Sequence, residues 1–490
     1  MFDFTMLAFT IPHRSQRLKH FLIVAILGFV TTVCPLRGVM AQVGSGETQS
    51  LWTRAQGEDW PRMLGARYDS TSTEKGIRTN WGDQGLRVVW SAPTGEGYGN
   101  GVASHGRWFQ FDRFEDRERL TCHHAETGQI LWTWESPVTY FDAYGYNNGP
   151  RCSPVVDGER VYVYGAAGKL ACVSTSDGKR IWEKNLNEEF WVIPNFFGVG
   201  ASPLVYRDIL WVMVGGSRPD GRSAADLSVN DVPSSRPNQC ALVGFDKRTG
   251  NVLHRVGNYL ASYAAPVVRE INGKDVLLAF VREGLLAFNP SDGSDERFYA
   301  WRASSLESVN GAPPTLVQGD VLIGEAYEKG GSLLKIGSSG LQAIWTDGKS
   351  RRDQVFRPHW TNPLVIGSNV FVSSGRNEPD TDLRCLEWSK EKGKVEVTTT
   401  WSIRNRDRMT GIVIDNHLLL LGERGVLQLV KPNTSRFELV AEMDLTNQQV
   451  PGEQRPYVHT PSWAPPVVSH GLLYVRGTDR IVCLELIPTS

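Results

Sequence analysis

The sequence predicts an all-β fold, an eight-bladed β-propeller of four-stranded antiparallel blades that is closed by an N-terminal strand. Three observations predict it. A unit of strand-like runs, four in a complete copy, occurs eight times, the fourth run of several units contains a tryptophan, and the last unit lacks its fourth run. Because a tandem repeat can tile one large domain, the length of 490 residues does not by itself give the number of domains.

The N-terminal residues have the pattern of an export signal. Arg14, Arg17 and Lys19 precede an apolar run at 21–33, and Val39-Met40-Ala41 forms a small-residue cleavage site. We therefore expect a secretory signal at residues 1–41, with the mature chain exported to the periplasm or the outside of the cell. A retained membrane anchor is the alternative, but the apolar run is shorter than the ~20 residues that a spanning helix needs. We expect no transmembrane segment in the mature chain.

Composition and charge restrict the class of partner. The chain is 41% hydrophobic and 21% charged, as in ordinary globular proteins with a large core. Loss of residues 1–41 removes four of the 52 basic and one of the 53 acidic residues, which leaves a net charge of about −4. Since no basic stripe or run occurs, we expect no nucleic-acid partner.

One complete repeat unit extends from Ser153 to Trp182. It contains runs at 153–158, 161–165, 170–173 and 176–182, each of strand length and each followed by residues that favour turns. This order predicts a four-stranded antiparallel meander. Proline is tolerated at the start of the first strand because that position can spare its amide hydrogen. Other units begin at Gly101-Val102, Ser202-Pro203, Ala265-Pro266, Pro314-Thr315, Asn362-Pro363, Gly411-Ile412 and Pro465-Pro466.

The mature chain contains six cysteines, an even number that in an exported protein suggests disulfides. Four of them, however, occupy one repeated position of the third strand, which Gly or Ala fills in other units. We expect these four to be small buried side chains without a disulfide or metal partner, and no Cys-x-x-Cys spacing supports a zinc site. The four are Cys122, Cys172, Cys385 and Cys483, whereas Cys152 and Cys240 lie outside this position and stay unassigned.

Tryptophans recur in the fourth strand after a Thr-Gly or Asp-Gly turn, as at Trp132 and Trp182. We expect their wide rings to fill the spaces between twisted sheets, where each ring buries a large apolar area. The last unit stops after three runs, and residues 86–90, which also end in tryptophan, supply the missing strand. Such closure leaves no sheet edge exposed. The predicted organisation is a signal at 1–41, a lead-in segment at 42–85 and a single propeller domain at 86–490.

These features resemble the pyrroloquinoline-quinone (PQQ)-like repeat, whose hallmark is Ala-x-Asp-x-x-Thr-Gly-x-x-x-Trp. The run from Ala125 to Trp132 matches the second half of the hallmark and Phe245 to Gly250 matches its centre, and the resemblance covers roughly residues 86–487. Asp59-Trp60-Pro61 also resembles the lead-in of exported PQQ-like repeat proteins from planctomycete-type bacteria. The resemblance implies the eight-bladed fold, but a fold does not determine function.

The resemblance implies two alternative functions. Quinoprotein alcohol dehydrogenases stack PQQ against a disulfide between neighbouring cysteines and hold calcium near a catalytic Asp, whereas BamB is a scaffold lipoprotein in outer-membrane protein assembly. This chain has no Cys-Cys pair, and Thr31-Thr32-Val33-Cys34 is a poor lipidation signal. We expect a binding or scaffold module with a protein partner in the cell envelope and no cofactor. The alternative is a PQQ- and calcium-dependent dehydrogenase acting on alcohols or sugars.

The residues just before each first strand are the candidates for a ligand site, because the first strand is innermost and these residues crowd one mouth of the channel. A set rich in aromatic, Arg, Asn and His side chains suits a mostly apolar pocket with a few polar contacts, or it satisfies backbone groups of the loops. The principal candidates are Tyr98, Arg151, Tyr263, Asn310, His359 and Trp463, accompanied by Tyr146, Asn148, Phe197, Arg357, Arg408 and His459.

Catalysis would need a carboxylate at this mouth as a general base. Asp142, Glu188, Asp353 and Asp407 are possible, and nothing in the sequence ranks them. Calcium would need several converging oxygens, of which Asn148 and Asn310 could supply only two. The polar insertion at 217–239 is most simply a long loop of the third blade and a second candidate for partner contact.

Overall fold

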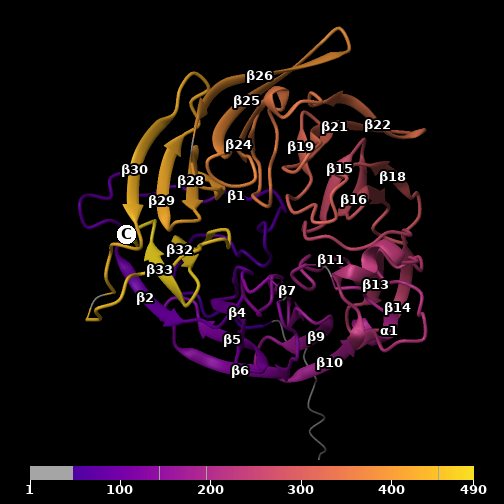
Figure 1. The fold of residues 1–490 in the computed structure, drawn as a ribbon. Helices are drawn as coiled ribbons and strands as arrows, with labels where there is room; N and C mark the ends of the chain where they lie inside the picture. Colours follow the sequence, from indigo (N-terminus) through magenta and orange to yellow (C-terminus); the bar gives the residue numbers. More distant parts are fainter. Residues whose placement is uncertain (1–47, 143, 195, 405, 451, 490) are drawn as a thin grey trace, which may run out of the picture. The chain divides into compact units, whose positions relative to one another are not determined.

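The computed structural model of the chain describes residues 48–142, 144–194, 196–404, 406–450 and 452–489. Eight sheets follow one another in chain order around a ring, and each is an antiparallel meander (Figure 1). The predicted eight-bladed β-propeller is therefore confirmed. The predicted signal at residues 1–41 lies outside the described residues.

The first strand of each blade is innermost and the fourth is outermost. Blade 1 contains β3 (Val102–Ser104), β4 (Arg107–Phe114), β5 (Arg117–His124) and β6 (Ile130–Pro137); blade 2 contains β7 (Val155–Asp157), β8 (Arg160–Tyr164), β9 (Lys169–Ser174) and β10 (Arg180–Asn185); blade 3 contains β11 (Leu204–Tyr206), β12 (Ile209–Met213), β13 (Leu242–Asp246) and β14 (Val252–Val256); and blade 4 contains β15 (Val267–Ile271), β16 (Lys274–Val281), β17 (Gly284–Phe288) and β18 (Arg297–Ala300).

The second half of the ring repeats this order. Blade 5 contains β19 (Thr315–Val317), β20 (Asp320–Glu325), β21 (Gly330–Gly337) and β22 (Gly340–Thr346); blade 6 contains β23 (Leu364–Ile366), β24 (Asn369–Ser374), β25 (Asp382–Glu391) and β26 (Lys394–Ile403); blade 7 contains β27 (Met409–Ile414), β28 (His417–Gly422), β29 (Val426–Lys431) and β30 (Glu438–Asp444); and blade 8 contains β31 (Val467–Ser469), β32 (Leu472–Arg476), β33 (Arg480–Glu485) and β2 (Val88–Pro93). A short strand of the lead-in, β1 (Thr71–Ser72), adds to blade 7 in parallel with β27.

Short helices occur only in connections within the described part of the chain. They are α1 (Leu186–Phe190), η1 (Ala224–Asp226), η2 (Val229–Ser234) and η3 (Arg351–Asp353). The insertion at 217–239 lies between β12 and β13, as expected for a loop of blade 3, and Leu227 and Val232 from it pack against Trp191 and Ile193. No described helix has the length and apolar character needed to cross a membrane.

A bulge in the fourth strands directs the predicted tryptophans between blades. The pairing of β10 with β9 shifts register between Arg180 and Trp182, and β6, β26 and β2 shift at the equivalent place. Trp132 Nε1 then donates to Thr175 O of the next blade at 3.1 Å. Gly178 of that blade has φ 72°, and a Cβ there would lie 2.6 Å from the Trp132 ring. Each such indole fills the space between two sheets, as predicted, and also joins them by a hydrogen bond.

The cysteine position is small because rings flank it on both sides. Cys172 lies opposite Tyr162 on one neighbouring strand and Trp182 on the other. All six described cysteines are buried and free, which confirms the packing role expected for the repeated position. Burial raises the pKa of the Cys172 thiol to about 12, so it stays a protonated, unreactive side chain. The two unassigned cysteines also pack in the core, where Cys152 Sγ donates to Ala201 O.

The ring closes between the first and last strands of the propeller domain, as predicted. In Figure 1 the purple β2 lies beside the yellow β33, and Trp90 pairs with Cys483. The strand runs from Val88 to Pro93 rather than ending at Trp90, because the ladder continues beyond the bulge. Next to this closure a buried ion pair joins blade 8 to blade 1, with Arg476 Nη2 2.6 Å from Asp112 Oδ1.

Candidate functional site

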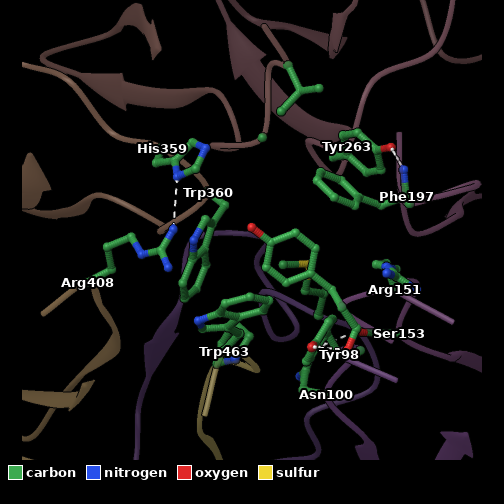
Figure 2. A pocket seen from close by; sticks show the side chains of 17 residues that line it. Tyr98, Asn100, Arg151, Ser153, Phe197, Tyr263, His359, Trp360, Arg408 and Trp463 are labelled. Atoms are coloured by element: carbon green, nitrogen blue, oxygen red, sulfur yellow. Dashed lines mark hydrogen bonds between the residues drawn. The ribbon is translucent and has the colours of Figure 1, made fainter. Parts of the chain in front are cut away.

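A cavity of about 220 Å³ opens at the channel mouth, where the chain enters the innermost strands. Aromatic side chains supply most of its wall, and two arginines lie on opposite sides of them (Figure 2). We call this cavity the mouth pocket. It is lined by Met63, Tyr98, Gly99, Asn100, Tyr146, Arg151, Ser153, Phe197, Gly200, Tyr263, Val309, Gly311, His359, Trp360, Arg408, Trp463 and Pro465.

Five of the six principal candidates line the mouth pocket, namely Tyr98, Arg151, Tyr263, His359 and Trp463. The sixth, Asn310, is completely buried behind it and donates from Nδ2 to Val281 O at 2.8 Å. Asn310 therefore holds the end of β16 and does not face a ligand. The accompanying candidates divide in the same way: Tyr146, Phe197 and Arg408 line the pocket, whereas Asn148, Arg357 and His459 do not.

The candidates outside the pocket have structural partners. Arg357 is buried and grips Asp380 with both terminal nitrogens, at 3.0 and 2.8 Å. Asn148 Oδ1 accepts from the amide of Asp142, and His459 is paired at the surface with Asp479. These three side chains therefore satisfy groups of the loops, which is the alternative role that the sequence left open.

Arg151 forms one side of the mouth pocket. Its Nη2 lies 2.7 Å from Oδ2 of the fully buried Asp142, and its Nη1 donates to Gly149 O. The guanidinium also lies 5.4 Å from the ring centroid of Tyr98 and 5.9 Å from that of Phe197. The buried carboxylate neutralises the arginine, so this side of the pocket is an uncharged surface of rings and guanidinium edges.

Arg408 forms the other side and is also neutralised. Its Nε lies 3.1 Å from both carboxylate oxygens of Glu423, and its guanidinium packs against both Trp360 and Trp463. Trp463 Nε1 donates to the same carboxylate at 2.8 Å. Burial raises the pKa of Glu423, but the hydrogen bonds and charge of Arg408 outweigh burial, and the pKa is lowered overall. The glutamate therefore stays ionised and the pair stays intact at neutral pH.

His359 is neutral and has a defined tautomer. Arg408 Nη1 lies 3.1 Å from His359 Nδ1, and because a guanidinium can only donate, Nδ1 must accept. The proton is then on Nε2, which lies 3.0 Å from the Tyr327 hydroxyl and donates to it. Burial, and then the charges of Arg408 and Arg376, lower the pKa of His359 to about 3.

Several other polar groups of the pocket bond to one another or to backbone. Ser153 Oγ donates to Asn100 Oδ1 at 2.5 Å, and the Tyr263 hydroxyl accepts from the amide of Phe197 at 2.7 Å (Figure 2). Asn100 Nδ2 donates to Gly101 O. Burial raises the pKa of Tyr263, so this hydroxyl stays protonated. The pocket offers a guest mainly ring faces.

None of the four candidate carboxylates is a lining residue. Asp142 lies under Arg151, and Asp407 Oδ2 accepts from the amide of Arg424, while Glu188 and Asp353 are exposed on α1 and η3. Calcium takes six to eight oxygens, and the described lining contains only one amide and four hydroxyl side chains besides backbone. Within the described part of the chain no group of three or more His, Cys, Asp or Glu could hold a metal. The residues present therefore do not fit the calcium site of a quinoprotein dehydrogenase.

Sequence reasoning missed several lining residues. Asn100 and Ser153 each stand two residues before a first strand, and Trp360 follows His359, so the position that selected the other candidates could have selected these three. Met63 belongs to the lead-in segment, outside every repeat, and nothing in the repeat pattern points to it.

The comparisons with known proteins agree with the fold. The sequence matches the family described as outer membrane protein assembly factor BamB over residues 83–217 and 116–399. No curated protein sequence matches the chain.

Solved structures of similar fold include BamB and two alcohol-oxidising dehydrogenases. BamB from Moraxella catarrhalis is 11% identical with a TM-score of 0.50, and the match covers 83% of this chain and 99% of that chain. A quinohemoprotein alcohol dehydrogenase from Comamonas testosteroni is 14% identical with a TM-score of 0.47, covering 88% and 81% of the two chains. A europium-containing methanol dehydrogenase is 10% identical with a TM-score of 0.46, covering 87% and 91%. At these identities the likeness shows the fold alone.

Proposed function

Because the chain belongs to the family of the outer membrane protein assembly factor BamB, we propose that it is an exported binding module whose mouth pocket receives an apolar side chain of a partner protein in the cell envelope. The observation that carries the proposal is an aromatic cavity of about 220 Å³ in which both arginines are already paired with carboxylates. An uncharged wall of rings favours an uncharged apolar guest, since a charged guest would lose hydration without gaining a free counter-charge.

The size of the cavity also favours a side chain. Pockets for drug-sized molecules measure roughly 300–1,000 Å³, and the mouth pocket is smaller than this range. Partner recognition through one buried aromatic or aliphatic anchor is common at protein interfaces. The pocket is therefore suited to a single anchor residue of a larger partner.

An exposed aromatic rim beside the pocket would extend the contact. Phe141, Tyr144 and Tyr146 are 74%, 52% and 58% exposed, and Tyr146 packs against both Phe197 and Trp463 of the pocket wall. Exposed aromatic side chains next to a pocket are typical of interaction surfaces. We assign the partner to this face, above blades 1 and 2.

Site-specific crosslinking tests the proposal. A photoreactive amino acid at position 146 of the mature chain should crosslink a partner in the native envelope, whereas the same group at position 253, where Leu253 is 46% exposed on β14, should not. With that partner purified, Trp463→Ala should weaken binding at least tenfold, as expected for an anchor pocket, and Leu253→Ala should leave it unchanged. Equal crosslinking at both positions, or equal affinity of both variants, would contradict the proposal.

The dehydrogenase alternative has its own readout. The mature chain is titrated with PQQ and calcium while absorbance and dye-linked alcohol oxidation are followed. Saturable cofactor binding together with turnover would replace the binding module with a quinoprotein enzyme.

A further inference from the structure

The lead-in segment passes through the inside of the ring. Trp60 forms a bridge with Ala103 of β3, Pro61 O accepts from Val156 of β7 at 2.8 Å, and the Tyr68 hydroxyl donates to Val205 O of β11 at 3.0 Å. Before this stretch, Ser469 Oγ of β31 donates to Glu58 O. After it, the segment continues around the inner wall, where Arg269 of β15 donates to Arg67 O and Tyr68 O. Asn362 Nδ2 then donates to Ser70 Oγ, and β1 pairs with β27.

These contacts place the segment below the mouth pocket. Ala103, Val156 and Val205 are each the second residue of their innermost strand, whereas the pocket residues precede those strands. Trp60 is 1% exposed and Leu64 is 3% exposed, so the segment packs into the channel as core and is not a loose tail. In Figure 1 β1 and part of the indigo chain lie inside the ring, while another part of the indigo chain extends past β30 at the left.

A tight turn brings one side chain of the segment up to the pocket. The amide of Gly65 donates to Arg62 O at 3.0 Å. Gly65 has φ 77°, and a Cβ at this position would press against the Trp60 ring. At the head of this turn Met63 lines the pocket, and its Sδ accepts from Ser202 Oγ of blade 3 at 3.9 Å. Within the lining, Met63 is the residue that comes from outside the propeller repeats.

We propose that the lead-in closes the channel from below, and that Met63, as the floor of the mouth pocket, determines the size of the apolar side chain that the pocket accepts. This inference rests on the proposed function. A methionine suits the role because its unbranched, polarisable thioether packs well against aromatic rings and adapts to the guest. Shortening the floor should favour a longer guest, and a rigid ring in its place should exclude guests.

Small probes that mimic a partner's side chain test the inference with the mature chain. The probes are N-acetyl-phenylalaninamide and N-acetyl-tryptophanamide, and their dissociation constants are measured by NMR titration. We expect Met63→Ala to raise the affinity ratio of the tryptophan to the phenylalanine probe at least fivefold, and Met63→Phe to weaken both probes at least fivefold. Met63→Leu, which nearly preserves the volume, is the matched control and should leave the ratio within twofold. Thermal unfolding of each variant verifies that the fold is retained.

The two ideas fail in different ways. If both probes bind the natural chain and Trp463→Ala abolishes binding, but Met63→Ala and Met63→Phe leave affinities and ratio unchanged, the floor role is wrong while the pocket stands. If neither probe binds the natural chain, the proposal that the mouth pocket receives a side chain is wrong, and so is the role of Met63 as its floor. A variant that unfolds is replaced by Met63→Gln, for which the inference expects at least fivefold weaker binding of both probes because an amide then faces the apolar guest, and unchanged affinity would contradict it.

Discussion

Replacing Arg476 by methionine should destabilise the ring at its closure. Arg476 is 3% exposed and Asp112 is 2% exposed, and the arginine also donates to Gly99 O and Gly95 O across the seam between blades 8 and 1. Methionine fills a similar volume but leaves Asp112 as an uncompensated buried charge. Breaking a buried pair in this way costs about 3–5 kcal/mol.

The expected shift in melting temperature follows from the size of the domain. At about 2.1 cal/mol/K per residue, a propeller of roughly 400 residues unfolds with an entropy of about 0.8 kcal/mol/K. The Arg476→Met variant should therefore melt about 4–6 °C below the natural chain in scanning calorimetry. The matched control is Lys394→Met, because Lys394 pairs with Glu396 at the surface with side-chain exposures of 77% and 64%. Exposed pairs of this kind contribute little to stability because both charges stay hydrated and screened, so the control should melt within about 1 °C of the natural chain.

The pH dependence adds a second check. Burial raises the pKa of Asp112 to about 6 even though Arg476 opposes the shift. Without Arg476 the pKa of Asp112 should rise further, so the variant should lose more stability at pH 8, where the carboxyl is ionised, than at pH 5, where it takes up a proton. If Arg476→Met shifts the melting temperature no more than Lys394→Met, or shifts it equally at both pH values, the closing role of this ion pair is wrong.

Three further outcomes are expected. Burial raises the pKa of Glu118 to about 7, so the natural chain should lose up to about 3 kcal/mol of stability as the pH rises from 4.5 to 7. Glu118→Gln should flatten this pH dependence of the free energy of unfolding in urea. An unchanged pH dependence would show that Glu118 is not the titrating group. Gly178→Ala combines a φ of 72° with a contact on Trp132 and should lower the free energy of unfolding by about 2–4 kcal/mol. The loss should be larger than for Gly158→Ala, where φ is 56° and the Cβ meets open space. Equal urea midpoints of the two variants would disprove the contact. Since the pKa of His359 is about 3, N-acetyl-phenylalaninamide should bind with the same affinity at pH 5 and pH 8, and a change above threefold would contradict a neutral histidine.

The fold could be predicted because the same local requirement recurs in every blade. The position of Cys172 must be small, since Tyr162 and Trp182 lie on either side of it, and this requirement appears in the sequence as a repeated Cys, Gly or Ala. The closing strand at residues 86–90 could be found in the same way, because the last unit lacked its fourth strand and this segment, which also ends in tryptophan, matched it. A repeated pattern therefore reports both the sheets and their closure.

The mouth pocket could be predicted only in part, because position in the repeat specifies depth in the channel but not side-chain direction. Asn310 and Ser153 both belong to the segments that lead into an innermost strand, yet Ser153 lines the pocket while the Asn310 amide turns away to Val281 O. Asp142 is next to the mouth, as expected, but Arg151 covers it. Met63 could not be found, since its place depends on a long-range path of the lead-in that no repeat encodes.

Some residues that line the mouth pocket also make the hydrogen bonds that join neighbouring blades. The walls of the pocket can therefore be rigid although loops form them. Gly99 lines the pocket and its carbonyl accepts from Arg476 at the seam, while Asn100 and Ser153 line it and bond blade 1 to blade 2. A guest at the proposed site would thus be held by side chains whose backbone is fixed by inter-blade bonds. Preorganised walls reduce the entropy lost on binding, so a small apolar cavity in this place can bind an anchor residue more firmly than its area alone would give.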